Sequence, residues 1–292
     1  KIPANYPLVM GHEIVGEVID GDTNGFAKPG ARVLVDPVLY CGTCFHCKQG
    51  DTNLCPNGGI MGREVNGGFA DYCIAKTSHI YPLPDELDSK TGAAIQVLTT
   101  VLHAQNKGNL AKGDAVIVSG LGVTGLMHIQ LAKARGAKVV VGTSRNAHKR
   151  EMALALGADY AVGHGEEAKK TILEATKGIG ADMVIECVGN LSMLAEAVDL
   201  ARLGGKIIPF GIYPSGQAEL PFYDFYFKEL QIINVRAAKG HDFSACIDLV
   251  SRGEVDLAPL ITHTLPYTEL NSAIRMLMEP SDERIKVILE AA

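Results

Sequence analysis

Short apolar segments alternate with amphipathic ones through the middle of the chain, between about residue 114 and residue 211. The apolar segments are rich in Val and Ile, as buried strands are, and the segments between them have the periodicity of helices. One such helix is predicted over residues 193–204, between strands within 182–189 and 206–211. Because parallel strands need crossover connections, this alternation predicts an α/β fold in which helices cover a doubly wound parallel sheet.

The segments on either side have a different pattern. From Gly11 to about Pro84, β-branched runs are separated by Gly, Pro and Asp turns, which predicts strands and loops, one of the strands within residues 68–84. The tail from about Phe243 is mixed. Helices are predicted in the tail over residues 245–253 and 269–278. Strands are predicted over residues 262–267 and 285–291.

Length and charge limit the class of protein. A chain of 292 residues is long for one core and predicts two domains. No apolar run approaches the roughly 20 residues that a membrane span requires. The formal net charge of −6, with no long basic run, does not favour nucleic acid or an anionic membrane as a partner. These features predict a soluble, cytoplasmic protein that acts on a small molecule.

A glycine-rich turn, SGLGVTG at residues 119–125, follows the first strand of the alternating region. Its spacing is G-x-G-x-x-G, and a helix-like segment begins directly after it. In this context the motif indicates a dinucleotide site, where the backbone approaches the pyrophosphate and a helix N-terminus faces the negative charge. The alternative is a strand-to-helix turn that binds no ligand. The predicted cofactor-binding residues here are Gly120, Gly122, Val123, Thr124 and Gly125.

The next strand predicts which dinucleotide binds. An NAD site normally has Asp or Glu at the end of that strand, facing the adenosine ribose. The sequence KVVVGTSRNAHKRE has none at that point and offers a hydroxyl and cations, which suit the 2′-phosphate of NADP. A solvated basic helix start is the alternative. The candidate residues are Ser144, Arg145, Lys149 and Arg150.

Cysteines are concentrated in residues 41–55, at Cys41, Cys44, Cys47 and Cys55. They are too close together to constrain a fold of this size efficiently as disulfides, whereas four thiolates at such spacings can bind zinc tetrahedrally. We therefore predict a zinc site. The scattered Cys73, Cys187 and Cys246 fit small buried hydrophobic residues and are assigned no chemistry.

The segment GHE, with His12 and Glu13, proves little by itself, because a His beside a Glu is more often structural. Taken together, however, GHEIVGEVIDGD, the four-cysteine lobe, SGLGVTG and the closing IKVIL resemble the zinc-dependent medium-chain dehydrogenase/reductase family, the alcohol and polyol dehydrogenases. The match runs in order over essentially the whole chain.

This resemblance implies a Rossmann domain for NADP binding, at residues 97–239, inserted in a GroES-like β-rich catalytic domain. The catalytic domain then comprises residues 1–96 and 240–292, and the cysteine lobe within it binds a structural zinc. Lys286 matches a basic residue near the pyrophosphate, and the turns 186–189 and 210–213 match loops beside the nicotinamide.

The resemblance also implies a second, catalytic zinc, which assists loss of the alcohol proton while the carbon releases hydride to the nicotinamide. His12 matches the histidine ligand, and Glu13 matches the adjacent carboxylate that ligates or orients. A further ligand position aligns with Gln96, whose neutral amide is a poorer ligand than thiolate or carboxylate. The family's first ligand, a cysteine, would precede Lys1, so we expect the chain to be a fragment of a longer enzyme.

The aromatic run at residues 222–227 lies where family members pair their subunits, which implies a homodimer or homotetramer; as a plain pattern it equally fits a packed strand connection. The leading interpretation is an NADP-dependent oxidoreductase that interconverts an alcohol and its aldehyde or ketone. Two alternatives remain. One is a zinc-independent enone or quinone reductase of the same superfamily, and the other is a dinucleotide-binding protein without turnover.

Overall fold

The computed structural model describes residues 6–21, 25–213 and 219–291. The chain divides into two compact units, one formed by Lys1–Thr100 with Arg236–Ala292 and the other by Val101–Val235. Helix α2 (Ser89–Lys107) contains the first of these breaks. The breaks predicted from the sequence lie near Gln96 and Lys239.

The unit Val101–Val235 is built on a six-stranded parallel sheet in the order β11-β10-β9-β6-β7-β8. Its strands are β6 (Ala115–Ser119), β7 (Val139–Thr143), β8 (Tyr160–Val162), β9 (Ala181–Glu186), β10 (Ala201–Pro209) and β11 (Gln231–Ile232). The chain proceeds outward from β6 to β8, then returns to the other side of β6 and proceeds outward again from β9. The order therefore reverses between β6 and β9, which confirms a doubly wound fold.

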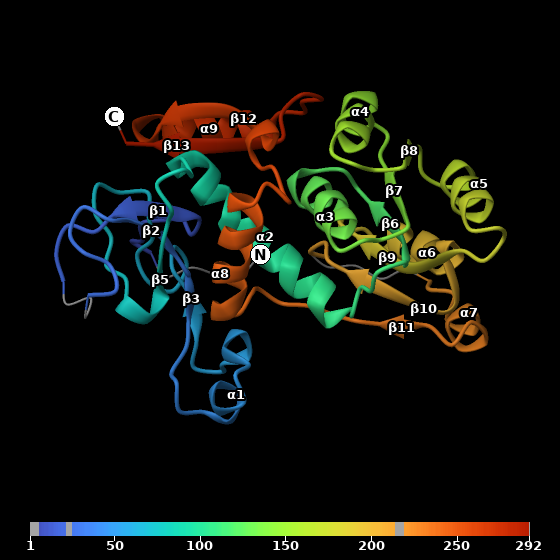
Figure 1. Ribbon diagram of the computed structural model, residues 1–292, viewed down its shortest axis with the longest axis horizontal. Helices are drawn as coiled ribbons and strands as arrows, with labels where there is room; N and C mark the ends of the chain where they lie inside the picture. Colours follow the sequence, from blue (N-terminus) through green and yellow to red (C-terminus); the bar gives the residue numbers. More distant parts are fainter. Residues whose placement is uncertain (1–5, 22–24, 214–218, 292) are drawn as a thin grey trace. The chain divides into compact units, whose positions relative to one another are not determined.

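Helices cover this sheet on both faces, with α3 on one side and α5 and α6 on the other (Figure 1). The helices of the unit are α3 (Val123–Ala134), α4 (Ala147–Ala155), α5 (Glu166–Ala175), α6 (Leu191–Leu200) and α7 (Phe222–Phe227). Every residue of β6 and β7 is buried, as expected of strands packed on both faces. Among the helices of the described residues, none combines the length and apolar character that crossing a membrane requires.

One prediction about this unit needs correction. The helix predicted over 193–204 ends at Leu200, because Ala201 already pairs with Ala181 as the start of β10. An irregularity in the pairing between Ala201 and Lys206 lets two glycines enter this strand, and the periodicity of the sequence does not reveal it. The aromatic run at 222–227 forms the helix α7, which connects the strands β10 and β11 along the chain.

The other unit contains short strands and small sheets. Three antiparallel strands form its main sheet in the order β1-β2-β5, β3 pairs with β4, and β12 pairs in parallel with β13. The strands are β1 (Ile14–Glu17), β2 (Arg32–Val35), β3 (Val38–Leu39), β4 (Gly59–Ile60), β5 (Ile80–Pro82), β12 (Ile261–Pro266) and β13 (Lys286–Glu290). The strand expected within 68–84 is limited to β5.

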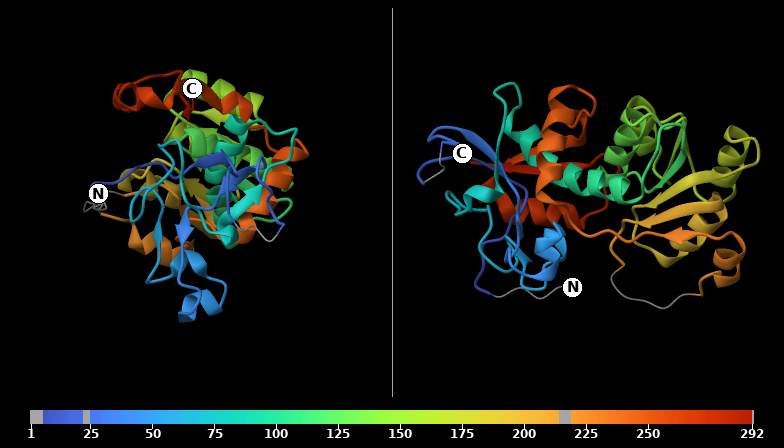
Figure 2. Two further views of the ribbon diagram at one scale, coloured as in Figure 1. Left: turned by 90° about the vertical axis from the view of Figure 1, so that its left-hand side faces the viewer. Right: turned by 60° about the horizontal axis from the view of Figure 1, so that its bottom comes forward.

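Helices α8 (Gly240–Ser251) and α9 (Leu270–Met278) belong to the returning tail of this unit. The short helix α1 (Phe45–Lys48) lies in a lobe that extends away from the strands β1 and β2 (Figures 1 and 2). A small apolar core packs around the main sheet, formed by Ile14, Ala27, Val33, Val35, Met61 and Ile80. The lobe contributes no residue to this core.

A buried carboxyl group lies directly after β2. The Asp36 side chain is only 2% exposed, and its Oδ1 accepts a hydrogen bond from the Val38 N–H at 2.9 Å. Burial raises the pKa of Asp36 to about 7; the Val38 bond opposes this shift and the Asp242 carboxylate adds to it. The folded protein therefore keeps a proton that the unfolded chain loses near pH 4, at about 3.9.

We predict that this group lowers the free energy of unfolding as pH rises from about 4 to about 7, by up to roughly 4 kcal/mol, because only the folded state still binds the proton in that window. Asp36→Asn keeps the acceptor for Val38 and removes the titration. The variant should therefore gain stability relative to the wild type between pH 5 and pH 8, measured by urea unfolding. Asp85→Asn, at an exposed carboxylate, is the matched control; a stability difference independent of pH would contradict the prediction.

Candidate metal and cofactor sites

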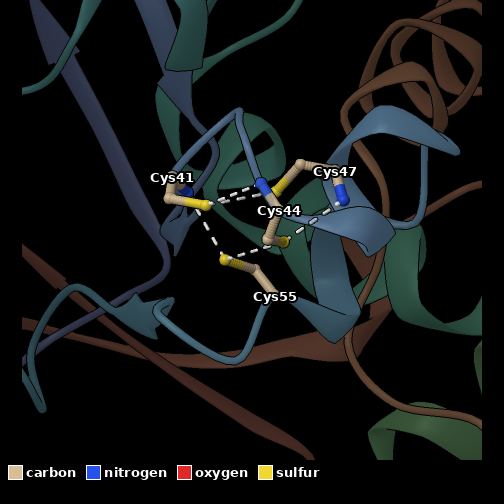
Figure 3. Close-up of side chains that lie close together, drawn as sticks. All are labelled: Cys41, Cys44, Cys47 and Cys55. Atoms are coloured by element: carbon tan, nitrogen blue, oxygen red, sulfur yellow. Dashed lines mark hydrogen bonds between the residues drawn. The ribbon is translucent and has the colours of Figure 1, made fainter.

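Four cysteine side chains converge in the lobe around α1, as Figure 3 shows. The Sγ atoms of Cys41, Cys44, Cys47 and Cys55 all lie within 4.8 Å of one another. The pair Cys41 and Cys47 is separated by 4.0 Å and the pair Cys44 and Cys55 by 3.9 Å. Sulfurs bound tetrahedrally at Zn–S distances of about 2.3 Å would be about 3.8 Å apart, so the cluster has the dimensions of a zinc site.

The local backbone prepares these sulfurs as acceptors. The Cys44 N–H donates to Cys41 Sγ at 3.3 Å, and the Cys47 N–H donates to Cys44 Sγ at 3.5 Å where α1 begins. Gly42, with φ of 75°, allows the turn between the first two ligands. Amide donors stabilise thiolate over thiol, which is the form that binds a metal.

The four thiols differ in how readily they lose a proton. Hydrogen bonds from the Thr43 backbone, and to a smaller extent from its hydroxyl, lower the pKa of Cys41 to about 5. Desolvation is the main cause that raises the pKa of Cys47 to about 12. A divalent ion bound at the centre of the cluster would stabilise the thiolate form of all four side chains. The residues fit zinc. Of the remaining cysteines, Cys246 is buried as expected and Cys73 is exposed.

Two contacts join the lobe to the tail of its own unit. Asn53 Nδ2 donates to the Arg236 carbonyl at 2.7 Å, and Lys239 Nζ lies 2.6 Å from Asp51 Oδ1. Both contacts start in the segment Asp51–Leu54, which directly precedes the last ligand. Fixing the cysteine loop by metal binding therefore also fixes one attachment point of the tail.

The glycine-rich turn lies at the carboxyl end of β6, and its three glycines have different surroundings. A Cβ on Gly125 would lie 1.9 Å from the Gly120 carbonyl, so α3 packs against the turn too closely for any side chain. Gly120 has φ of +95°, and Gly122 faces open space. No side chain caps the start of α3 at Gly122, which leaves the first N–H groups of the helix available to an anion. This arrangement fits a pyrophosphate.

The residues predicted to contact the ribose and its phosphate lie at the end of the neighbouring strand β7. Ser144 is nearly buried and Arg145 is exposed. Arg150 donates from Nη1 to the Ser144 carbonyl at 2.7 Å, so this guanidinium supports the turn. The Lys149 N–H is bound by the Asn146 side chain, which caps α4. The turn thus exposes the Arg145 cation beside the buried Ser144, whose hydroxyl oxygen accepts from the Asn146 N–H at 3.2 Å, and it has no acidic side chain of its own.

The sequence analysis singled out none of three polar residues near this carboxyl edge, although Glu186 and Tyr213 lie in the turns 186–189 and 210–213 that it matched to loops beside the nicotinamide. His164 Nδ1 lies 3.0 Å from Thr143 Oγ1 and 3.9 Å from Glu196 Oε1, beyond the end of β8. Glu186 is the last residue of β9, and Tyr213 donates its hydroxyl proton to Glu186. A polar residue that ends a buried apolar strand was the available signal for Glu186.

The residues predicted for a catalytic metal belong to the unit of Lys1–Thr100 and Arg236–Ala292. His12 is exposed, and Gln96 is buried on α2. Glu13 forms an ion pair with Lys286, which is itself nearly buried on β13. Within the described residues, the four cysteines form the one group of three or more His, Cys, Asp or Glu side chains close enough to share a metal. A catalytic zinc on His12, Glu13 and Gln96 stays a prediction.

Two protein-family models match the chain. The model described as "Alcohol dehydrogenase GroES-like domain" matches residues 1–85, and the model described as "Zinc-binding dehydrogenase" matches residues 123–252. Among curated proteins, the sorbitol dehydrogenase of Halalkalibacterium halodurans is 32% identical over 98% of this chain and 84% of its own length. The D-arabitol-phosphate dehydrogenase of Enterococcus avium is 32% identical over 98% and 82%.

Solved structures are similar throughout. A protein described as a zinc-binding dehydrogenase from Sinorhizobium meliloti, bound to NADP, superimposes with a TM-score of 0.91 at 30% identity, over 99% of this chain and 85% of its own. A short chain alcohol dehydrogenase from Escherichia coli, complexed with NADH, gives a TM-score of 0.90 at 30% identity, over 97% and 84%. The two relatives hold different dinucleotides.

We predict that Cys44→Ser loses the zinc of the lobe and lowers the midpoint of thermal unfolding, because three thiolates leave the site poorly closed. Zinc per chain, measured by atomic absorption after dialysis against a weak chelator, should fall by about one equivalent. Cys73→Ser is the matched control, since Cys73 lies outside the cluster. A Cys44→Ser protein with the zinc content of the wild type would show that the cluster is not the site.

Proposed function

The chain belongs to the zinc-dependent medium-chain dehydrogenase/reductase family, whose named relatives here are alcohol and polyol dehydrogenases, and we propose that it is an NADP-dependent polyol dehydrogenase. In the reaction, a secondary alcohol and NADP⁺ give a ketone, NADPH and a proton. The alcohol carbon loses its hydride to the nicotinamide, and the hydroxyl proton leaves to solvent or a base. The polyol assignment is supported by two relatives named for sorbitol and D-arabitol phosphate.

One observation supports NADP above all. The turn after β7 has Ser144 and Arg145 where an NAD site would have an acidic residue, and it lies beside the turn of β6 that fits a pyrophosphate. A guanidinium can form two parallel charge-assisted hydrogen bonds to a 2′-phosphate. Arg150 donates to the Ser144 carbonyl at 2.7 Å and so helps to fix the conformation of the turn.

The residues proposed for the catalytic metal are His12, Glu13 and Gln96. When bound, zinc makes the alcohol hydroxyl more acidic and so assists hydride release. The ion pair with Lys286 holds the Glu13 carboxylate and favours an orienting role for it over direct ligation. Of these three residues, His12 is the best candidate for a direct zinc ligand, because its imidazole is exposed and imidazole nitrogen is a common zinc ligand.

The chain is also proposed to form a homodimer or homotetramer through the α7 edge of its sheet. Four aromatic side chains of α7 are 65% to 83% exposed, and the adjacent β11 is an edge strand. Large exposed apolar groups beside a free sheet edge are typical of interfaces. The aromatic residues are Phe222, Tyr223, Tyr226 and Phe227. Sedimentation equilibrium tests this assembly, and a monomer at micromolar concentration would argue against it.

We expect the wild type to bind NADP(H) more tightly than NAD(H), and Arg145→Ala to weaken NADP(H) alone. Loss of a charge-assisted pair costs roughly 1.5 to 3 kcal/mol, or about ten- to hundredfold in Kd. Calorimetric titration of both cofactors measures this, with Lys138→Ala, an exposed cation before β7, as the control. Equal wild-type affinities for the two cofactors would refute the preference.

For the zinc-loaded enzyme, we predict that His12→Ala removes the zinc that supports turnover and leaves the zinc of the cysteine lobe. NADPH formation with sorbitol and arabitol phosphate should then fall by about 100-fold or more, since nothing else assists deprotonation. The cofactor Kd should be unchanged. His241→Ala, at an exposed imidazole, is the control. An active His12→Ala enzyme with unchanged zinc content would remove His12 from the site.

A further inference from the structure

Glu186, the last residue of β9, is a carboxylate with no exposed surface. Among the described residues, no Lys, Arg or His nitrogen lies within 4.0 Å of it, in contrast to Asp182 on the same strand, which Arg202 binds at 2.6 Å. Burial of a charged group is costly unless a counter-charge repays it. Glu186 therefore raises the question of what stabilises a buried carboxylate at the end of a central strand.

Hydrogen bonds to Glu186 come from donors on two turns. Its Oε1 accepts from the N–H groups of Val188 at 2.7 Å and Gly189 at 3.1 Å, and its Oε2 accepts from the Tyr213 hydroxyl. Burial raises the pKa of Tyr213, and the bond to Glu186 raises it further, so the phenol keeps its proton and donates. Each of these partners donates a proton, which suits an ionised carboxylate as the acceptor.

The strand order locates this anion relative to a bound dinucleotide. The turn after β6 fits the pyrophosphate, and the end of β7 lies on the adenosine side. The nicotinamide half then belongs to the opposite side of β6, where β9 and β10 end. The ends of β6 and β9 are joined directly, since the N–H of Cys187, the residue after β9, donates to the carbonyl of Ser119, the last residue of β6, at 2.8 Å. Glu186 is therefore the buried charge on the nicotinamide side of the switch point.

We propose that Glu186 biases the bound cofactor toward its oxidised form. The oxidised nicotinamide ring has a positive charge, and the reduced ring, after accepting hydride, has none. A buried anion therefore lowers the free energy of the oxidised complex more than that of the reduced complex, because the interior screens charge poorly. Bound NADP⁺ is stabilised, which favours carbonyl reduction on the enzyme. A purely structural link between the turns would need only a neutral acceptor.

This inference rests on the proposed dinucleotide site and is tested without turnover. The Kd values of the oxidised and reduced forms of both cofactors are measured by titration, without alcohol, for the wild type and Glu186→Gln. Glutamine keeps the size and an acceptor for the Val188 and Gly189 amides, so the variant removes mainly the charge. We expect the ratio of the oxidised to the reduced Kd to rise about tenfold.

Tyr213→Phe is the matched control, because it removes the bond between the two turns and keeps the charge. It should weaken both cofactor forms by the same factor. If Glu186→Gln also changes both forms equally, or if Tyr213→Phe raises the ratio as much as Glu186→Gln does, the charge has no such role and the inference is overturned. A wild type that binds neither dinucleotide would instead overturn the proposed function itself.

If Glu186→Gln loses cooperative unfolding, the ratio is measured in Val188→Lys against Val188→Met. Val188 is 50% exposed in the turn that Glu186 holds, so a lysine there can offset the carboxylate without entering the core. A rise in the ratio with lysine alone supports the proposal. Equal ratios in the two variants overturn it.

Discussion

Backbone hydrogen bonds join the ends of β6, β7 and β9 and determine the geometry of this part of the sheet's carboxyl edge. Gly120 donates its N–H to the Thr143 carbonyl at 2.9 Å, and Cys187 donates to Ser119 at 2.8 Å, so three strand ends are joined by main-chain atoms. A Cβ on Gly120 would lie 2.6 Å from Val188 Cγ2. A side chain at position 120 would therefore clash with the turn after β9. Because the strand ends are hydrogen-bonded to one another, the turns that follow them have fixed relative positions.

The cysteine lobe solves a different physical problem. Its helix α1 and the 3-10 turn Thr52–Leu54 are four and three residues long, and neither provides a residue to the apolar core of its unit. Segments this short cannot bury enough surface to offset the entropy of ordering them. A zinc ion bound by the four thiolates would replace that missing core, and the contacts of Asn53 and Asp51 would transmit the resulting rigidity to the start of the tail.

Local patterns were sufficient to predict the parallel sheet with its glycine-rich turn and the cysteine cluster, because strand periodicity, the glycine spacing and the cysteine spacing are encoded in short segments, whereas the GroES-like domain was expected from the family resemblance. The exceptions are informative. The strand start at Ala201 depends on pairing with Ala181, and the pairing of Glu13 with Lys286 joins residues 273 apart in the sequence. Neither contact has a local signature. Glu186 was visible only as part of a turn, since its burial and its bond to Tyr213 depend on how two loops meet.

The carboxyl edge of the sheet has charges of opposite sign at its two ends. On the side of β7, Arg145 is exposed and the start of α3 offers free amide donors, an environment for phosphates. On the side of β9, the buried charge is the negative Glu186. An oxidised dinucleotide has the complementary order, with anionic phosphates at its adenosine end and a cationic ring at the other. Hydride transfer removes only the ring charge, so the phosphate contacts on the β7 side contribute equally to both redox states, whereas a charge on the β9 side acts on the two states differently.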